Sequence, residues 1–204
     1  TAAATTLLSL ALGVPLAHWL AGADFRGKGL VTGLLVLPIV LPPVVSGILL
    51  VSVVGPDGLG GLAGVRLSRT WLGVVLAQTF VASPFVVVTA IAAFEGVDRR
   101  LVEAARTLGD GPVASFRRVT LPLAWPGILA GATLTFARAM GEFGATMVVA
   151  YYPRTLPVAI WRSFVGHGLA EAVPVATVLL TVSLVALLGL RVLGGSGTLG
   201  SVWP

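Results

Sequence analysis

Few residues of this chain could do chemistry, and two of them lie inside an apolar run. Arg138 and Glu142 are four positions apart within the apolar stretch from Leu123 to Ala150. On a helix they fall on one face and can neutralise each other. Charged side chains at membrane depth are costly and usually face the interior of a helix bundle. The pair predicts either a structural ion pair that fixes helix packing or a functional charged site within the membrane.

The other distinctive segment, residues 95–122, is the only stretch where charges recur every few positions. Its first half predicts an amphipathic helix from Val97 to Leu108, with an apolar side formed by Leu101, Ala104, Ala105 and Leu108. Gly109 suits a left-handed helix end, and Pro112 suits the first turn of a second short helix. The spacing alone leaves two interpretations open: a rigid knob that docks a partner, or a surface helix that merely connects two spans.

Several kinds of chemistry find no support in the sequence. Cysteine is absent, which excludes disulfides, thiolate metal sites and Cys nucleophiles. No Walker-type phosphate loop occurs, so nucleotide hydrolysis by this chain has no support. The spans hold no set of paired Asp, Ser/Lys or His ligands that could form a catalytic or metal site. We therefore expect no catalytic residue, no metal and no cofactor in this chain itself.

The composition is that of a membrane protein. Mean hydropathy is +1.01, and charged residues make up 10% of the chain, against about 25% in a typical soluble domain. The net charge is +5. Because the Arg residues are scattered among apolar runs, nucleic acid is a poor explanation for this charge. We expect an all-α integral membrane protein in contact with a lipid bilayer.

Five stretches are long and apolar enough to span a bilayer as helices. They are Thr1 to Ala21, Gly29 to Val54, Thr70 to Phe94, Leu123 to Ala150, and Ala172 to Leu190. Prolines at positions 38, 42, 43 and 84 are expected to bend the second and third spans. Gly127 and Gly131 form a G-x-x-x-G pattern that predicts close helix packing, either within the chain or at a dimer seam.

The basic residues favour one orientation. Most of them fall in the first and third loops or after the last span: Arg26, Lys28, Arg99, Arg100, Arg106, Arg117, Arg118 and Arg191. Fewer fall on the opposite side: Arg66, Arg69, Arg154 and Arg162. Basic loops stay in the cytoplasm. The segment 95–122 is therefore expected to be cytoplasmic, and residues 194–204, rich in glycine at the start, to form a flexible tail.

Four motifs resemble those of one transporter family. Glu103-Ala104-Ala105, then Gly109, then Val119, Leu121 and Pro122 resemble the EAA loop of ABC importer permeases. The stretch from Phe136 to Thr146 is similar to the signature of oxyanion permeases. Residues 37–47 are similar to the proline-rich second span of molybdate permeases, and residues 151–157 resemble the archaeal tungstate/molybdate type.

The resemblance implies a machine and a set of roles. Residues 1–193 would form the permease domain of an importer in the plasma membrane of a bacterium or archaeon. The expected partners are a second copy of the chain, two cytoplasmic ABC ATPase subunits and an extracytoplasmic solute-binding protein. ATPase coupling would fall to Glu103, Ala104, Ala105, Arg106, Gly109, Phe116, Leu121 and Pro122. The translocation path or gate would include Arg138, Glu142, Pro42, Pro43 and Ser46.

Three functions stay open at this point. The first is import of a tetrahedral oxyanion, molybdate or tungstate, by alternating access driven by the separate ATPases. The second is a sulfate/thiosulfate permease, since that group shares the G-E-[F/Y]-G motif. The third belongs to a different class: a membrane scaffold without transport.

Overall fold

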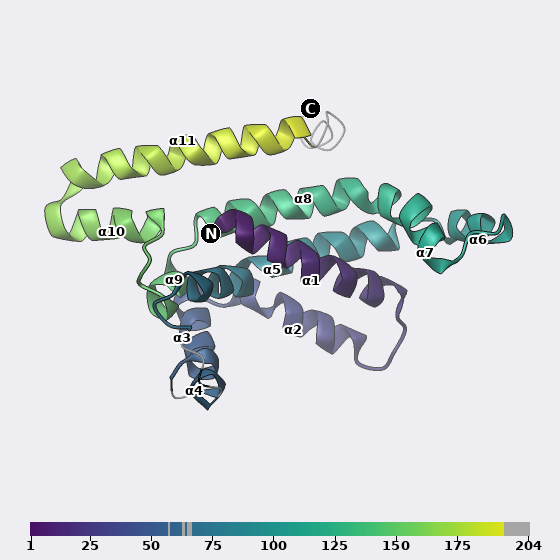
Figure 1. The fold of residues 1–204 in the computed structure, drawn as a ribbon, viewed down its shortest axis with the longest axis horizontal. Coiled ribbons are helices and arrows are strands. Elements are labelled where there is room, and N and C mark those ends of the chain that lie inside the picture. The colour runs from purple at the N-terminus through teal and green to yellow at the C-terminus, as the bar shows by residue number, and fades with distance from the viewer. Residues whose placement is uncertain (57, 63, 65–66, 194–204) are drawn as a thin grey trace.

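The computed structural model describes residues 1–193 except 57, 63 and 65–66, and its elements are helices (Figure 1). Three long helices lie side by side at the centre: α1 (Ala2–Gly22), α5 (Trp71–Glu95) and α8 (Leu121–Met140). Helix α5 lies between the other two and is the most buried of them. Its buried positions are mostly small or β-branched, including Ala77, Val81 and Val86. Small side chains let neighbouring helices approach closely, so this helix can be the axis of the bundle.

The G-x-x-x-G pattern packs within the chain. A Cβ added to Gly127 would lie 2.5 Å from the Cβ of Ala93, and one added to Gly131 would collide with Thr89. Both contacts join α8 to α5. Of the two interpretations that the sequence left open, the structure therefore shows the intramolecular one.

The second expected span is not one continuous helix. Helices α2 (Lys28–Val40) and α3 (Pro43–Val54) meet at an angle of 118°. Neither Pro42 nor Pro43 has a backbone N–H, and a proline also forces the residue before it out of the helical conformation. Helix α2 has 13 residues, so it is only about 20 Å long, shorter than the roughly 30 Å hydrocarbon core. The bend was expected from the prolines, but the complete break was not.

The fourth expected span differs from the structure at both ends. At its start, α7 (Pro112–Ser115), a π-helical turn (Phe116–Thr120) and α8 run on without a break as 29 residues. The expected separate short helix therefore belongs to the span. At its end, α8 stops at Met140, and a second helix, α9 (Gly144–Val149), follows after a break. The prediction of one helix from Leu123 to Ala150 is wrong there, because Gly141 and the residues after it leave the helical path.

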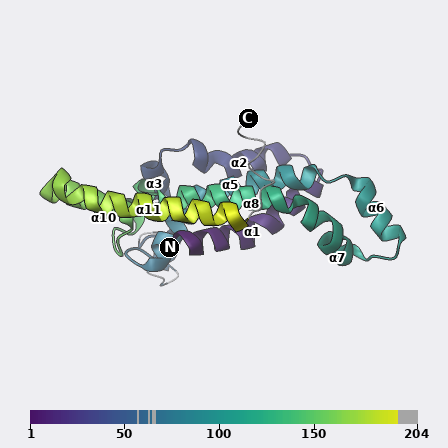
Figure 2. The same cartoon turned by 90° about the horizontal axis from the view of Figure 1, so that it is seen from above.

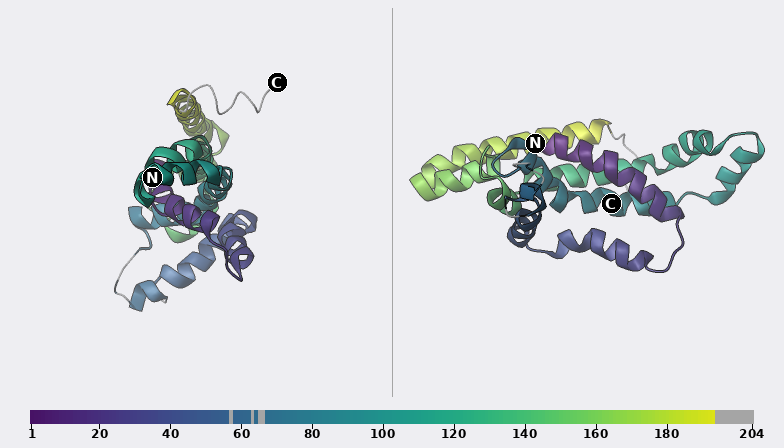
Figure 3. Two further views of the ribbon diagram at one scale, coloured as in Figure 1. Left: turned by 90° about the vertical axis from the view of Figure 1, so that its right-hand side faces the viewer. Right: turned by 60° about the horizontal axis from the view of Figure 1, so that its bottom comes forward.

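The last two long elements lie at the edge of the bundle. Helix α10 (Leu156–His167) turns into α11 (Leu169–Leu193), which contacts α10 extensively and α8 slightly. Figure 3 shows α11 at one edge of the bundle and α2 at the other. Only 6% of the apolar stretch of α11 within Leu169–Gly189 is buried inside the protein. This apolar surface needs lipid or another subunit to cover it.

Four described helices are long and apolar enough to cross a membrane, or five spans if α2 and α3 count as one. The loop with Lys28 and the segment that begins at Glu95, the first and third loops of the expected topology, lie at the same end of the bundle. There the Lys28 Nζ lies 3.4 Å from the Glu95 Oε1. The short helix α4 (Leu59–Leu62) lies at the other end (Figure 1). The expected flexible tail, residues 194–204, lies outside the described residues.

Candidate functional site

A helical arm projects from one end of the bundle (Figure 2). It consists of α6 (Arg99–Thr107), the turn at Gly109 and α7. The Asp98 side chain caps α6 by accepting a hydrogen bond from the backbone N–H of Arg100 at 2.9 Å. Gly109 adopts φ +97°, a conformation that costs other residues energy. Pro112 opens α7 as the sequence predicted.

Helix α6 turns an apolar edge away from the bundle. Leu108 is 89% exposed, and Leu101, Ala104 and the nearby Val113 are exposed as well. We call these four residues the apolar ridge. Leu101, Ala104 and Leu108 follow a helical spacing of three and four, so they share one side of α6. Contiguous exposed apolar side chains usually mark a surface that contacts another protein or a membrane.

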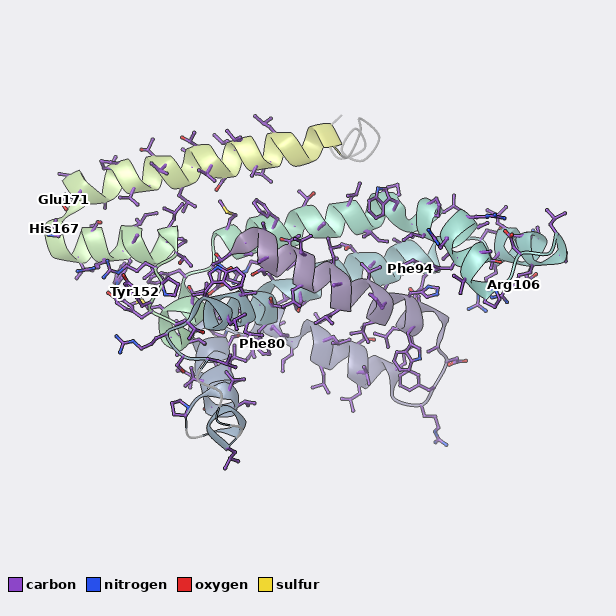
Figure 4. The ribbon with its side chains drawn as sticks, in the orientation of Figure 1. Phe80, Phe94, Arg106, Tyr152, His167 and Glu171 are labelled. Atoms are coloured by element: carbon purple, nitrogen blue, oxygen red, sulfur yellow. The ribbon has the colours of Figure 1, made fainter. Side chains whose placement is uncertain are left out.

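The charged side of α6 borders a cleft of about 750 Å³ between the arm and the bundle. Arg99, Glu103 and Arg106 line the cleft on the arm, and Asp24 and Lys28 line it on the bundle. Figure 4 shows Arg106 on the arm, and Tyr152, His167 and Glu171 at the opposite end of the molecule. The expected docking residues thus divide: Ala104 belongs to the ridge, whereas Glu103 and Arg106 border the cleft.

Phe116 ties the base of the arm to two spans. Its ring centroid lies 4.6 Å from that of His18 in α1 and 6.2 Å from that of Phe94 in α5. Leu121 packs on the same buried cluster, while Pro122 is exposed in the first turn of α8. Phe116 and Leu121 therefore pack the base of the arm against the bundle and do not form its outer surface.

A second cluster forms at the other end, where the two breaks in the helices meet. Helix α3 packs against α9. A Cβ added to Gly144 would lie 2.9 Å from the Cβ of Pro43, and one added to Gly47 would lie 2.9 Å from the Cα of Ala145. Each glycine thus lets the backbone of one broken helix touch the other. We call this region the break cluster.

Glu142 lies within the break cluster, between α8 and α9. Its Oε1 accepts a hydrogen bond from the backbone N–H of Ala145 at 2.7 Å, and its Oε2 lies 2.6 Å from the Arg138 guanidinium. The side chain of Glu142 is 1% exposed and that of Arg138 is 27% exposed. The expected ion pair is therefore present, but Glu142 caps α9 instead of continuing α8.

The structure brings several expected path residues together. Pro43 contacts Gly144, two residues after Glu142, and the neighbouring Ser46 is fully buried with no hydrogen-bond partner for its hydroxyl. Pro42 forms the N-terminal boundary of α3 and is exposed. The path residues from the second and fourth expected spans thus meet in one place, and the arm lies at the opposite end.

Three buried polar residues of the core were missed in the sequence: Thr5, Gln78 and Thr135. Gln78 accepts a hydrogen bond from Thr5 and donates one to the backbone of Ala139. All three lie within expected spans, and this was the available signal, since buried polar groups in membrane helices usually bond across helices.

Metal binding has little basis in the described part of the chain. No group of three or more His, Cys, Asp or Glu side chains is placed there to hold a metal ion. His167 and Glu171 pair at 3.1 Å, but both are well exposed. Two ligands fall short of the four that a structural zinc site takes.

Apolar spans, helices broken within the membrane-spanning region and a polar arm at one end define a membrane permease. Over residues 10–194 the chain matches the family described as binding-protein-dependent transport system inner membrane component. The chain belongs to this family. The resemblance noted in the sequence is thereby confirmed.

Individual relatives carry narrower names. A probable molybdenum ABC transporter permease protein of Haloferax volcanii is 61% identical over 190 residues, 93% of this chain and 71% of that protein. A molybdate/tungstate transport system permease protein of Pyrococcus furiosus is 41% identical over 197 residues, 97% of this chain and 76% of that protein. A molybdenum transport system permease protein of Haemophilus influenzae is 40% identical over 179 residues, 83% and 78% of the two chains.

Proposed function

We propose that this chain forms the translocation path for molybdate or tungstate in an ATP-driven importer of the plasma membrane. The three relatives described above are all named for molybdenum, molybdate or tungstate. The two ends of the helix bundle suit separate tasks. The arm suits coupling to an ATPase, and the break cluster suits a gate. A second copy of the chain and an extracytoplasmic binding protein complete the assembly.

The observation that carries the proposal is the exposed apolar ridge on a charged arm. A connecting loop has no need of apolar side chains exposed on one edge, whereas a docking helix does. We propose that two ATPase subunits cover the ridge in the cytoplasm and bind ATP and Mg²⁺ themselves. Their closure moves α6, and the rigid contact of Phe116 with α1 and α5 carries this movement into the bundle.

The break cluster is the gate in this proposal. Half-helices that end within a membrane leave backbone groups available to a substrate, and transporters use such breaks beside their binding sites. Arg138 is partly exposed, so it can attract a dianion. Its pairing with Glu142 leaves the pair neutral, which keeps the attraction weak enough for the oxyanion to pass. Pro42, Pro43 and Ser46 form the facing side of the gate.

Docking is tested by comparing two leucines of nearly equal exposure. Leu108 is 89% exposed on the arm, and Leu62 is 86% exposed on α4 at the opposite end. Leu108→Ser should weaken binding of the ATPase subunit by about tenfold, because a central apolar contact is worth more than 1 kcal/mol. Leu62→Ser should leave the affinity unchanged. Titration of the detergent-purified permease with its ATPase measures both, and equal affinities for the two variants would contradict docking at the ridge.

Substrate class is tested by uptake into proteoliposomes that contain the permease, its ATPase and its binding protein. Radiolabelled molybdate should enter with ATP and be displaced by unlabelled tungstate but not by sulfate. Displacement by sulfate would favour the sulfate/thiosulfate permease, as would a permease that purifies only as a pair of different chains. A permease that purifies without any ATPase partner, and whose deletion from cells leaves molybdate uptake intact, would indicate a scaffold.

A further inference from the structure

The core holds one side chain that links three helices at the end of α8. Gln78 of α5 is 2% exposed. Its Nε2 donates a hydrogen bond to the backbone oxygen of Ala139 in α8 at 3.1 Å, and its Oε1 accepts one from the Thr5 hydroxyl in α1 at 3.1 Å. A carbonyl oxygen can only accept, so the amide must turn its nitrogen toward Ala139 and its oxygen toward Thr5.

The acceptor of this bond lies at the point where α8 breaks. The same Ala139 oxygen also accepts the backbone N–H of Glu142 at 3.2 Å. That bond closes the turn which carries the chain out of α8. Gln78 therefore holds the turn from which the Glu142 side chain reaches both Arg138 and the start of α9.

A neighbouring hydrogen bond joins the same two helices without touching the break. The Thr135 hydroxyl of α8 donates to the backbone oxygen of Ala82 in α5 at 3.2 Å. Thr135 and Ala139 are one helical turn apart, as are Gln78 and Ala82, so the two bonds form successive rungs between antiparallel helices. The Thr135 rung holds α5 against α8, whereas the Gln78 rung holds α5 against the turn at Glu142.

We propose that Gln78 is a positioning residue of the gate: it fixes the end of α8, and through it the Arg138–Glu142 pair, to the rigid α1–α5 core. This inference rests on the proposed function of the break cluster. Within a bilayer no water replaces a lost hydrogen bond, so the turn at Glu142 depends on the protein groups around it. The link also explains how a shift of α1 and α5, started at the arm, reaches the gate at the other end.

The test compares the two rungs. Gln78→Met keeps the approximate length and size of the side chain but removes both of its hydrogen bonds. Thr135→Val keeps the shape of the side chain but removes the neighbouring hydrogen bond between α8 and α5. In proteoliposomes of the complete importer, the quantity to measure is the number of molybdate ions imported per ATP hydrolysed. This ratio does not change with the amount of folded importer, so a variant that merely yields less assembled protein leaves it unaltered.

Gln78→Met should lower the ratio by at least about fivefold, because it frees the turn at Glu142 from a bond that contributes about 1 kcal/mol. Thr135→Val should stay within about twofold of the unmodified chain, because its bond does not touch that turn. Equal ratios for Gln78→Met and the unmodified chain, or equal losses for both variants, would overturn the proposal. If Gln78→Met does not assemble, Gln78→Asn is measured by the same criteria, since its shorter amide cannot reach both partners. An unmodified importer that hydrolyses ATP and imports no oxyanion would instead contradict the proposed function, and this role of Gln78 with it.

Discussion

The guanidinium of Arg138 and the carboxylate of Glu142 lie 2.6 Å apart, yet one side chain is partly open and the other is sealed inside the protein. The buried carboxylate also accepts the Ala145 N–H. Glu142 is therefore held from two sides, whereas Arg138 is held mainly by Glu142. In the proposed gate, a substrate anion would compete with Glu142 for Arg138 while the Glu142 side chain stays buried.

Replacement of Glu142 alone should destabilise the permease more than replacement of both Arg138 and Glu142. Glu142→Gln can still accept the Ala145 N–H but leaves Arg138 without its counter-charge, which costs about 3 kcal/mol for a buried pair and less here because Arg138 is partly exposed. The double variant with Arg138→Gln should recover about 1 kcal/mol of that stability, as contacting residues do not add independently. Thermal unfolding of the purified permease in detergent measures the cycle.

Uptake separates the two interpretations of the pair. If it serves the translocation path, the double variant should assemble but import molybdate more slowly. Unchanged uptake and assembly in the double variant would show that the pair only fixes helix packing.

The contact between the two broken helices should tolerate no added methyl group. Gly144→Ala would place a carbon 2.9 Å from the Pro43 Cβ, and such overpacking costs about 1 to 3 kcal/mol. Gly33 of α2 has nothing within 4 Å of an added Cβ, so Gly33→Ala should be neutral or slightly stabilising. Thermal unfolding compares the two, and equal melting temperatures would contradict the close packing of α3 and α9.

The shape of the arm should depend on Gly109. Its φ of +97° is unfavourable for any residue with a Cβ, and Gly109→Ala should cost about 1 kcal/mol or more. Gly111, two residues on, has φ −67° and open space around it, so Gly111→Ala is the matched control. We expect Gly109→Ala alone to reduce ATP-dependent uptake, because it changes the angle between α6 and α7. A loss of equal size in both variants would mean that the turn geometry plays no part.

Phe116 should connect the arm to the bundle mechanically. Phe116→Ala removes ring contacts to His18 and Phe94, and should destabilise the permease by roughly 1 to 3 kcal/mol, less than for a fully buried ring. Uptake per ATP should fall as well, because the arm would move without carrying α1 and α5. Val113→Ala, on the exposed ridge, should change stability far less. Retention of full uptake per ATP in Phe116→Ala would exclude this route of coupling.

The first, third and last spans and the turn at Gly109 could be predicted because they follow from local rules, whereas the second and fourth expected spans are each broken. Apolar length set the spans, and the special conformation of glycine set the turn between α6 and α7. The ion pair was also predictable, since a spacing of four residues brings two side chains together over one helical turn.

Contacts between residues far apart in the sequence could not be predicted. At the break after Met140, Gln78 bonds to Ala139 from a distance of 61 positions in the sequence, a contact that no local pattern indicates. The packing of Pro43 on Gly144 is of the same kind. Likewise, the helical pattern of α6 grouped Leu101 with Ala105, but only the fold shows which side of that helix the bundle covers.

The central claim is that the arm lies in the cytoplasm and docks an ATPase. The chain has no cysteine, so a single Leu108→Cys introduces one thiol at the ridge and Leu62→Cys introduces one at the opposite end. In membrane vesicles of known orientation, a thiol-reactive crosslinker should join Leu108→Cys to the ATPase subunit, and an impermeant maleimide should label it only from the cytoplasmic side. Leu62→Cys should give no such crosslink and be labelled from the outside. Labelling of Leu108→Cys from the outside, or no crosslink to the ATPase from the ridge, would contradict the account.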